Sequence, residues 1–239
     1  MARSTIEISM RPARIAELLR PFLSNSCHSE SGRRLGEEPA ILSPLQLDHI
    51  STYIDLLIRW NSRINLTAIR DPEEIITRHF GESLFAARHL FPATACVRTT
   101  APGCLADLGS GAGFPGIPIK LWAPDIALIL IESNSKKATF LREVVRSLTL
   151  TNVDIQNTRA ETITQTCDIV TLRAVEHFGD ALRVAARLAT PTGCLALLIG
   201  SSQLNEAHST LPQFVWQPPV PVPQSQSRIL LMGAVAPTV

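Results

Sequence analysis

The 239-residue sequence has few cysteines, no long apolar segment and almost no net charge. Its five cysteines are scattered, include no CxxC pair and are Cys27, Cys96, Cys104, Cys167 and Cys194. We therefore expect neither a disulfide framework nor a zinc site, and we expect the reducing cytoplasm as the setting. The longest apolar runs, such as ALILI before Glu132, are too short to cross a bilayer, so no membrane partner is expected.

The first twenty residues are rich in charge and lack the apolar region of a secretory signal. The net charge of +1 neither supports nor excludes a nucleic-acid partner, because such binding depends on a local basic face. A hydrophobic fraction of 45% is ordinary for a globular protein with a sizeable core. These observations indicate one large domain, or one domain with an extension.

Residues 1–95 are predicted to form a helical N-terminal extension. An amphipathic stretch covers residues 11–23, and a second helix starts at Ser43 and Pro44, a favourable N-cap followed by proline. A third helix starts at Asp71 and Pro72, with two glutamates in its first turn, where acids suit the helix dipole. Residues 24–40 are polar and lack periodicity, so we expect a mobile linker there.

From residue 96 to residue 239 the pattern predicts an α/β domain of the Rossmann-like type. Short apolar runs alternate with helical segments, which is typical of a mostly parallel sheet covered on both faces. The expected strands are 104–108, 127–131, 153–155, 168–172 and 194–199, and the expected helices include 136–148 and 180–189. The last apolar runs, between residues 214 and 232, are separated by no helix-length segment and predict an antiparallel edge hairpin.

The strongest motif is DLGSGAGFPG, residues 107–116, directly after the first expected strand. Gly109, Gly111 and Gly113 allow a sharp turn and a close approach of the backbone to a ligand. Asp107 ends the strand at the edge where open α/β sheets bind ligands. Glu132 ends the second strand, where a carboxylate can accept hydrogen bonds from both hydroxyls of a ribose.

Several interpretations of this loop compete. A P-loop needs Lys and Ser or Thr after the last glycine, but Ile117 follows Gly116. A nucleophile elbow needs glycine where Leu108 stands. A dinucleotide site matches the glycine spacing, but Pro115 and Pro118 remove amide donors that would hold a pyrophosphate. S-adenosylmethionine, which is cationic and has no phosphate, suits the loop better, and a purely structural glycine turn is the remaining alternative.

Two further clusters follow later strands. Ala160 and Glu161, preceded by Arg159, lie beside the expected nucleoside pocket, although such charged residues are more often simply solvated. Arg173 ends the fourth strand at the centre of the sheet, where it is expected to face the site and position substrate. A salt-bridged arginine at the rim is the alternative.

Four segments occur in a fixed order: WNSRINLTAIRDPEEIITRHFGESL (60–84), DLGSGAGFPGIPIK (107–120), TRAE (158–161) and LRAV (172–175). Together they resemble the RsmG/GidB family of bacterial 16S rRNA guanine-N7 methyltransferases. The resemblance implies a seven-stranded Rossmann-like methyltransferase fold and S-adenosylmethionine as cofactor. It implies cofactor contacts at Gly109, Phe114, Ala160, Glu161 and Arg173, to which the residues themselves add Asp107, Gly111, Gly113 and Glu132.

The resemblance also implies 16S rRNA, or the small ribosomal subunit or its precursor, as partner of a monomeric enzyme. Methylation at guanine N7 needs no general base, because N7 carries a free lone pair. His79 and His89 are accordingly expected to cap or pack. The alternatives are a methyltransferase of the same fold acting on another RNA or a small molecule, and a nucleotide-binding module without catalysis.

Two departures from the family pattern concern positive charge. Ile199 stands where the family has lysine before Gly200, and the C-terminal segment offers only Arg228 in place of an Arg-His pair. RNA binding needs cations at the mouth of the site. The candidates, for each of which a solvated face is the alternative, are Arg59, Arg63, Arg70, Arg78, Lys136 and Lys137.

Overall fold

The computed structural model describes residues 10–24, 41–92 and 103–235. Before the sheet lie α1 (Pro12–Leu23), α2 (Pro44–Asn61), α3 (Pro72–Glu74), the π-helical segment η1 (Ile75–Gly81) and α4 (Glu82–Leu90). The caps are those that the sequence predicts: Ser43 and Gln46 form a capping box, and the Asp71 side chain accepts a hydrogen bond from the amide of Glu74. Of the predicted linker 24–40, Ser24 ends α1 and residues 25–40 lie outside the described ranges.

The rest of the chain alternates strands and helices. Its elements are β1 (Cys104–Leu108), α5 (Gly116–Trp122), β2 (Ala127–Ile131), α6 (Ser135–Ser147), β3 (Val153–Gln156), η2 (Ala160–Thr162), β4 (Cys167–Arg173), α7 (Phe178–Leu188), β5 (Ala189–Gly200), η3 (Ser201–Gln203), α8 (Leu204–Thr210), β6 (Phe214–Trp216), β7 (Val220–Pro221) and β8 (Arg228–Val235). No helix in the described ranges is long and apolar enough to span a membrane.

The strands form one mixed sheet in the order β3-β2-β1-β4-β5-β8-β6, with the short β7 also paired to β8. The first five strands in this order are parallel, and β8 runs antiparallel to β5, β6 and β7. The predicted α/β class and the antiparallel C-terminal strands are therefore confirmed. β8 lies between β5 and β6, so it is an inner strand rather than an edge strand.

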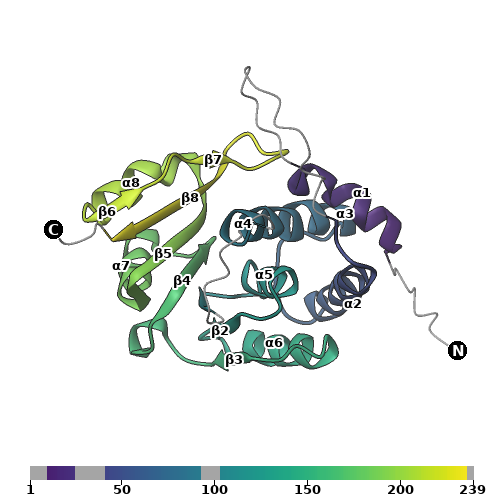
Figure 1. The fold of residues 1–239 in the computed structure, drawn as a ribbon. Coiled ribbons are helices and arrows are strands. Elements are labelled where there is room, and N and C mark those ends of the chain that lie inside the picture. The colour runs from purple at the N-terminus through teal and green to yellow at the C-terminus, as the bar shows by residue number, and fades with distance from the viewer. Residues whose placement is uncertain (1–9, 25–40, 93–102, 236–239) are drawn as a thin grey trace, which may run out of the picture.

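Helices cover both faces of the sheet, with α7 and α8 on one face and α4, α5 and α6 on the other (Figure 1). Side chains alternate along each strand between these two layers: Leu105 packs with the N-terminal helices, α5 and α6, whereas Ala106 packs with α7 and α8. The helices before residue 95 thus share a hydrophobic cluster with one face of the sheet. The predicted boundary at residue 95, between a helical extension and an α/β domain, stays a prediction.

Two local expectations were wrong. β5 starts at Ala189 and not at residue 194, because residues 189–193 extend the strand beyond an irregularity in its pairing with β4. Cys104 and Cys167 form a disulfide, although no disulfide was expected. The two residues are 63 positions apart, so no local spacing reveals the pair, but they lie on the neighbouring strands β1 and β4 with their Cα atoms 4.8 Å apart.

Candidate functional site

The glycine-rich loop joins β1 to α5 and requires its glycines. Gly109, Gly111 and Gly113 have φ angles of +71°, +58° and +88°, in the left-handed region that favours glycine. A Cβ on Gly113 would also lie only 2.7 Å from the Cδ1 of Ile117. The amides of Gly109 and Ser110 donate to the carbonyl of Ile131, which ties the loop to the end of β2. The loop therefore brings bare backbone to the carboxyl end of the central strands.

Asp107 lies beneath this loop and is almost completely buried. Its Oδ1 accepts a hydrogen bond of 2.8 Å from the hydroxyl of Thr171, and its Oδ2 accepts one of 3.2 Å from the amide of Gly116. Burial raises the pKa of Asp107 to about 6, against the opposite effect of these hydrogen bonds. In this structure the carboxyl group links β1, β4 and the start of α5. Its predicted direct contact with a cofactor stays a prediction.

Glu132 follows β2, and its carboxylate lies against the glycine-rich loop. Oε2 accepts a 2.8 Å hydrogen bond from the amide of Gly111, and Oε1 accepts one of 2.7 Å from the amide of Asn134. Each oxygen has a second lone pair, so the carboxylate can still accept from ribose hydroxyls. The structure thus brings together the loop glycines and the acidic residue that the sequence assigned to one ligand.

Ala160 and Glu161 lie in η2, at the carboxyl end of β3 next to β2. Nη2 of Arg187 donates to the carbonyls of Glu161 (2.8 Å) and Ala160 (3.3 Å). The side-chain amide of Asn157 donates to the carbonyl of Glu132 at 2.9 Å, which connects this turn to the end of β2. Sequence reasoning missed Arg187 and Asn157, because they act on backbone groups far away in the chain.

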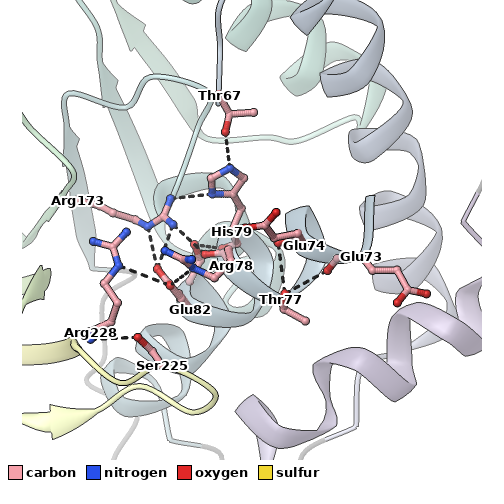
Figure 2. Close-up of polar contacts among 11 residues, drawn as sticks. Thr67, Glu73, Glu74, Thr77, Arg78, His79, Glu82, Arg173, Ser225 and Arg228 are labelled. Carbon is pink, nitrogen blue, oxygen red and sulfur yellow. Dashed lines mark hydrogen bonds and ion pairs between the residues drawn. The ribbon is translucent and has the colours of Figure 1, made fainter. Parts of the chain in front are cut away.

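Arg173 ends β4, and its side chain points into the N-terminal helical layer (Figure 2). Nη2 lies 3.0 Å from Oε2 of Glu82 and donates to the carbonyl of Arg78 at 2.8 Å. Nη1 lies 3.0 Å from Nδ1 of His79. The arginine is buried and is held mainly by η1 and the start of α4. Its expected contact with substrate stays a prediction.

His79 connects Arg173 to the glycine-rich loop. A guanidinium only donates, so Nδ1 of His79 accepts, and the ring hydrogen on Nε2 is donated to the hydroxyl of Thr67 at 2.8 Å. Burial and the charges of the surrounding arginines lower the pKa of His79 to about 3, which keeps the ring neutral. The ring stacks on Phe114, with centroids 4.7 Å apart. His79 packs, as expected, but its link to Arg173 was missed.

Phe114 is buried and contacts other aromatic rings besides His79. It stacks on Tyr53 of α2, with centroids 5.3 Å apart and nearly parallel planes. The hydroxyl of Tyr53 donates to the carbonyl of Ala112 within the loop. Phe114 thereby anchors the loop to the N-terminal layer, and its predicted contact with a cofactor stays a prediction.

The residues that surround the Arg173 side chain come largely from one segment. The π-helical η1 carries Arg78 and His79, and Glu82 follows it; single π-helical turns are frequent at functional sites. Sequence reasoning named Arg78 and His79 but missed Glu82 and the contacts of all three with Arg173. A common signal was available, since all three belong to the 60–84 segment that carries the resemblance. Of the expected RNA-binding cations, Arg59 pairs with Glu143 and Arg78 with Glu82. Arg63, Arg70 and Lys136 are exposed, and Lys137 is half-buried.

The family model described as "rRNA small subunit methyltransferase G" (GidB) matches residues 46–218. Two curated relatives are named "Ribosomal RNA small subunit methyltransferase G". The one from Xylella fastidiosa (strain 9a5c) is 40% identical over 181 residues, which are 73% of this chain and 81% of the relative. The one from Stenotrophomonas maltophilia (strain K279a) is 40% identical over 168 residues, 70% of this chain and 72% of the relative.

Solved structures share the fold at low sequence identity. A ribosomal protein L11 methylase from Lactobacillus delbrueckii subsp. bulgaricus has a TM-score of 0.53 and 13% identity, covering 66% of this chain and 78% of its own. TYW2 of M. jannaschii, solved in complex with AdoMet, has a TM-score of 0.52 and 12% identity, covering 72% of this chain and 78% of its own.

Proposed function

Because this chain belongs to the GidB family of rRNA small subunit methyltransferases, we propose that it transfers the methyl group of S-adenosylmethionine to N7 of a guanine in 16S rRNA. One structural observation carries the cofactor assignment. The glycine-rich loop, Glu132 and the Ala160–Glu161 turn follow β1, β2 and β3, which are neighbours in the sheet. Ligands of open α/β sheets bind at this edge.

The residues present fit a cofactor without phosphate. Glu132 offers carboxylate oxygens beside the loop, as a ribose needs. The start of α5 is poorly suited to a pyrophosphate, because Pro115 and Pro118 have no amide hydrogen and the amide of Gly116 already donates to Asp107. The buried acid at that position would also repel a phosphate. These features favour S-adenosylmethionine over a dinucleotide.

The cofactor supplies a methyl group on a positively charged sulfur, and the chain has to align it with the base. Guanine N7 attacks with its own lone pair, so no residue needs to remove a proton. This agrees with the site, where both nitrogens of His79 and both oxygens of Asp107 are engaged within the chain. The residues therefore contribute alignment and electrostatics rather than acid-base catalysis.

The test uses nucleoside mass spectrometry on 16S rRNA from cells with and without the gene. We expect 7-methylguanosine at one position to disappear with the gene and to return when purified protein and S-adenosylmethionine are added to the unmodified small subunits. Calorimetry should show binding of S-adenosylhomocysteine and none of NAD. Unchanged 7-methylguanosine in cells without the gene would refute the assignment, and a methylated small molecule instead would select the alternative substrate.

A further inference from the structure

The cluster around Glu82 carries more positive than negative charge. Arg78, Arg173 and Arg228 lie 3.0, 3.0 and 3.7 Å from the carboxylate oxygens of Glu82 (Figure 2). They come from three elements that are distant in the chain: η1, β4 and β8. One carboxylate neutralises one guanidinium, so the four side chains together have a net charge of +2.

The electrostatic effect of this excess appears in the neighbouring groups. All three arginines lower the pKa of His79, in addition to the larger effect of burial. Burial is also the largest cause that lowers the pKa of Arg173, and Arg228 and Arg78 add to it by repulsion. Charges taken out of water are normally paired. An anion placed next to the cluster would relieve this repulsion.

The two arginines at the surface are Arg78 and Arg228. Their side chains are 41% and 23% exposed, against 7% for Arg173. Both approach the same oxygen of Glu82, Oε1, so their guanidinium groups lie close together. A hollow of about 30 Å³ beside Arg78 and Glu82 is also lined by Thr77 and Ser225. It has room for about one water, so an anion of the size of phosphate would lie across its mouth.

The cluster lies at the same edge of the sheet as the cofactor loop. Arg173 ends β4, and Arg228 starts β8 opposite Gly200, the last residue of β5. His79 connects Arg173 to Phe114 of the loop, and a Cβ on Gly109 would lie 3.1 Å from the side chain of Val175. An anion bound here would therefore lie at the edge of the sheet where we propose that the methyl group is transferred.

We propose that Arg78 and Arg228 bind a backbone phosphate of the substrate rRNA, while Glu82 and Arg173 hold the two guanidinium groups in place. The guanidinium fork matches phosphate oxygens in geometry and charge. Arg228 also supplies a cation beside Gly200, where the strand end has Ile199 in place of the lysine of the family pattern. This inference rests on the proposed function and assigns its substrate contact.

The experiment measures binding of purified, unmodified small ribosomal subunits between about 50 and 200 mM salt, the range over which phosphate contacts strongly change affinity. Arg228→Gln and Arg78→Gln should each weaken binding roughly tenfold, as for a lost charge-assisted hydrogen bond. Each should lower the slope of log Kd against log salt by about one. Arg228→Lys keeps the charge and should retain most of the slope. Arg183→Gln, an exposed arginine paired with Asp180 on α7, is the matched control and should bind like the wild type.

The anion could come from an RNA phosphate or from the cofactor carboxylate, and calorimetry with S-adenosylhomocysteine distinguishes the two. Unchanged cofactor affinity in Arg228→Gln, with weakened subunit binding, supports the RNA phosphate. An equal loss of both would assign the arginines to the cofactor carboxylate and overturn the proposal, as would wild-type subunit binding by Arg228→Gln at every salt concentration. Failure of the wild-type protein to methylate small subunits would instead refute the proposed function itself.

Discussion

At the scale of single residues, the site depends on carboxylates that the fold keeps away from water. Asp107 and Glu82 are both buried, but their partners differ. Glu82 is surrounded by arginines, whereas Asp107 is held by a hydroxyl and a backbone amide. Burial disfavours the charged form of Asp107 more than its hydrogen bonds favour it, so its pKa rises from 3.8 to about 6.

This raised pKa predicts that the free energy of unfolding depends on pH. Because the folded-state pKa is the higher one, the contribution of Asp107 is fully present below pH 3.8 and is lost as the pH rises through about 6. Asp107→Asn does not titrate, and its amide can donate to Thr171 while its oxygen accepts from Gly116. We expect the free energy of unfolding of Asp107→Asn, relative to wild type, to rise by up to about 3 kcal/mol between pH 4 and pH 7.

Urea unfolding at a series of pH values measures this difference, with the exposed Asp180→Asn as control. A difference that stays flat with pH would show that Asp107 titrates normally. The same variant also tests whether Asp107 contacts the cofactor or only supports the loop. If it binds S-adenosylhomocysteine like the wild type, Asp107 supports the loop without contacting the cofactor through its charge.

At the scale of elements, the N-terminal helices hold the glycine-rich loop in place. Tyr53 of α2 reaches the loop twice, by stacking on Phe114 and by its hydrogen bond to Ala112. The π-helical η1 adds His79, which also stacks on Phe114. The helices before β1 therefore contribute directly to the site, in addition to any contact that they make with RNA.

Tyr53→Phe tests this link, because it removes the hydroxyl and keeps the stacked ring. The loss of one buried hydrogen bond should weaken S-adenosylhomocysteine binding by about 1 kcal/mol, or roughly fivefold, in calorimetry. Trp60→Phe is the control: it removes a 2.9 Å hydrogen bond to Glu143 from the same helix, but away from the loop. Equal cofactor affinity in Tyr53→Phe and wild type would mean that the loop holds its conformation without α2.

At the scale of the whole molecule, one hydrophobic cluster joins the N-terminal helices to the sheet. Ile15 of α1 and Ile54 of α2 belong to the same cluster as Leu105 of β1 and Leu141 of α6. Cutting the chain near residue 95 would expose this shared surface to water. Parts of a protein that share one hydrophobic cluster are expected to unfold in a single cooperative transition.

We therefore expect the N-terminal helices and the far side of the sheet to unfold together. Trp60 packs against the shared cluster, and Trp216 packs against the cluster on the opposite face. One variant keeps Trp60 and the other keeps Trp216, and in each variant the other two tryptophans are replaced by Phe. Within each variant, fluorescence and circular dichroism should give the same urea midpoint. Separate midpoints would identify residues 1–95 as an independent folding unit.

Much of this architecture follows from local sequence. Apolar runs such as ALILI form strands because they are buried on both faces of a parallel sheet, and Ser43 and Asp71 start helices because their side chains accept backbone amides. The turn at Gly109, Gly111 and Gly113 is equally local, since only glycine takes these φ angles without strain. The fold class and the place of the glycine-rich loop could therefore be predicted.

Other features required the tertiary structure. The pairing of Cys104 with Cys167 depends on the position of β4 next to β1, and the direction of the Arg173 side chain depends on Glu82, which lies 91 positions earlier. The approach of Arg228 to Glu82 depends on the return of β8 to the side of β5. These interactions join residues whose separation in sequence is large and has no period, so only the packing of the helices on the sheet decides that they meet.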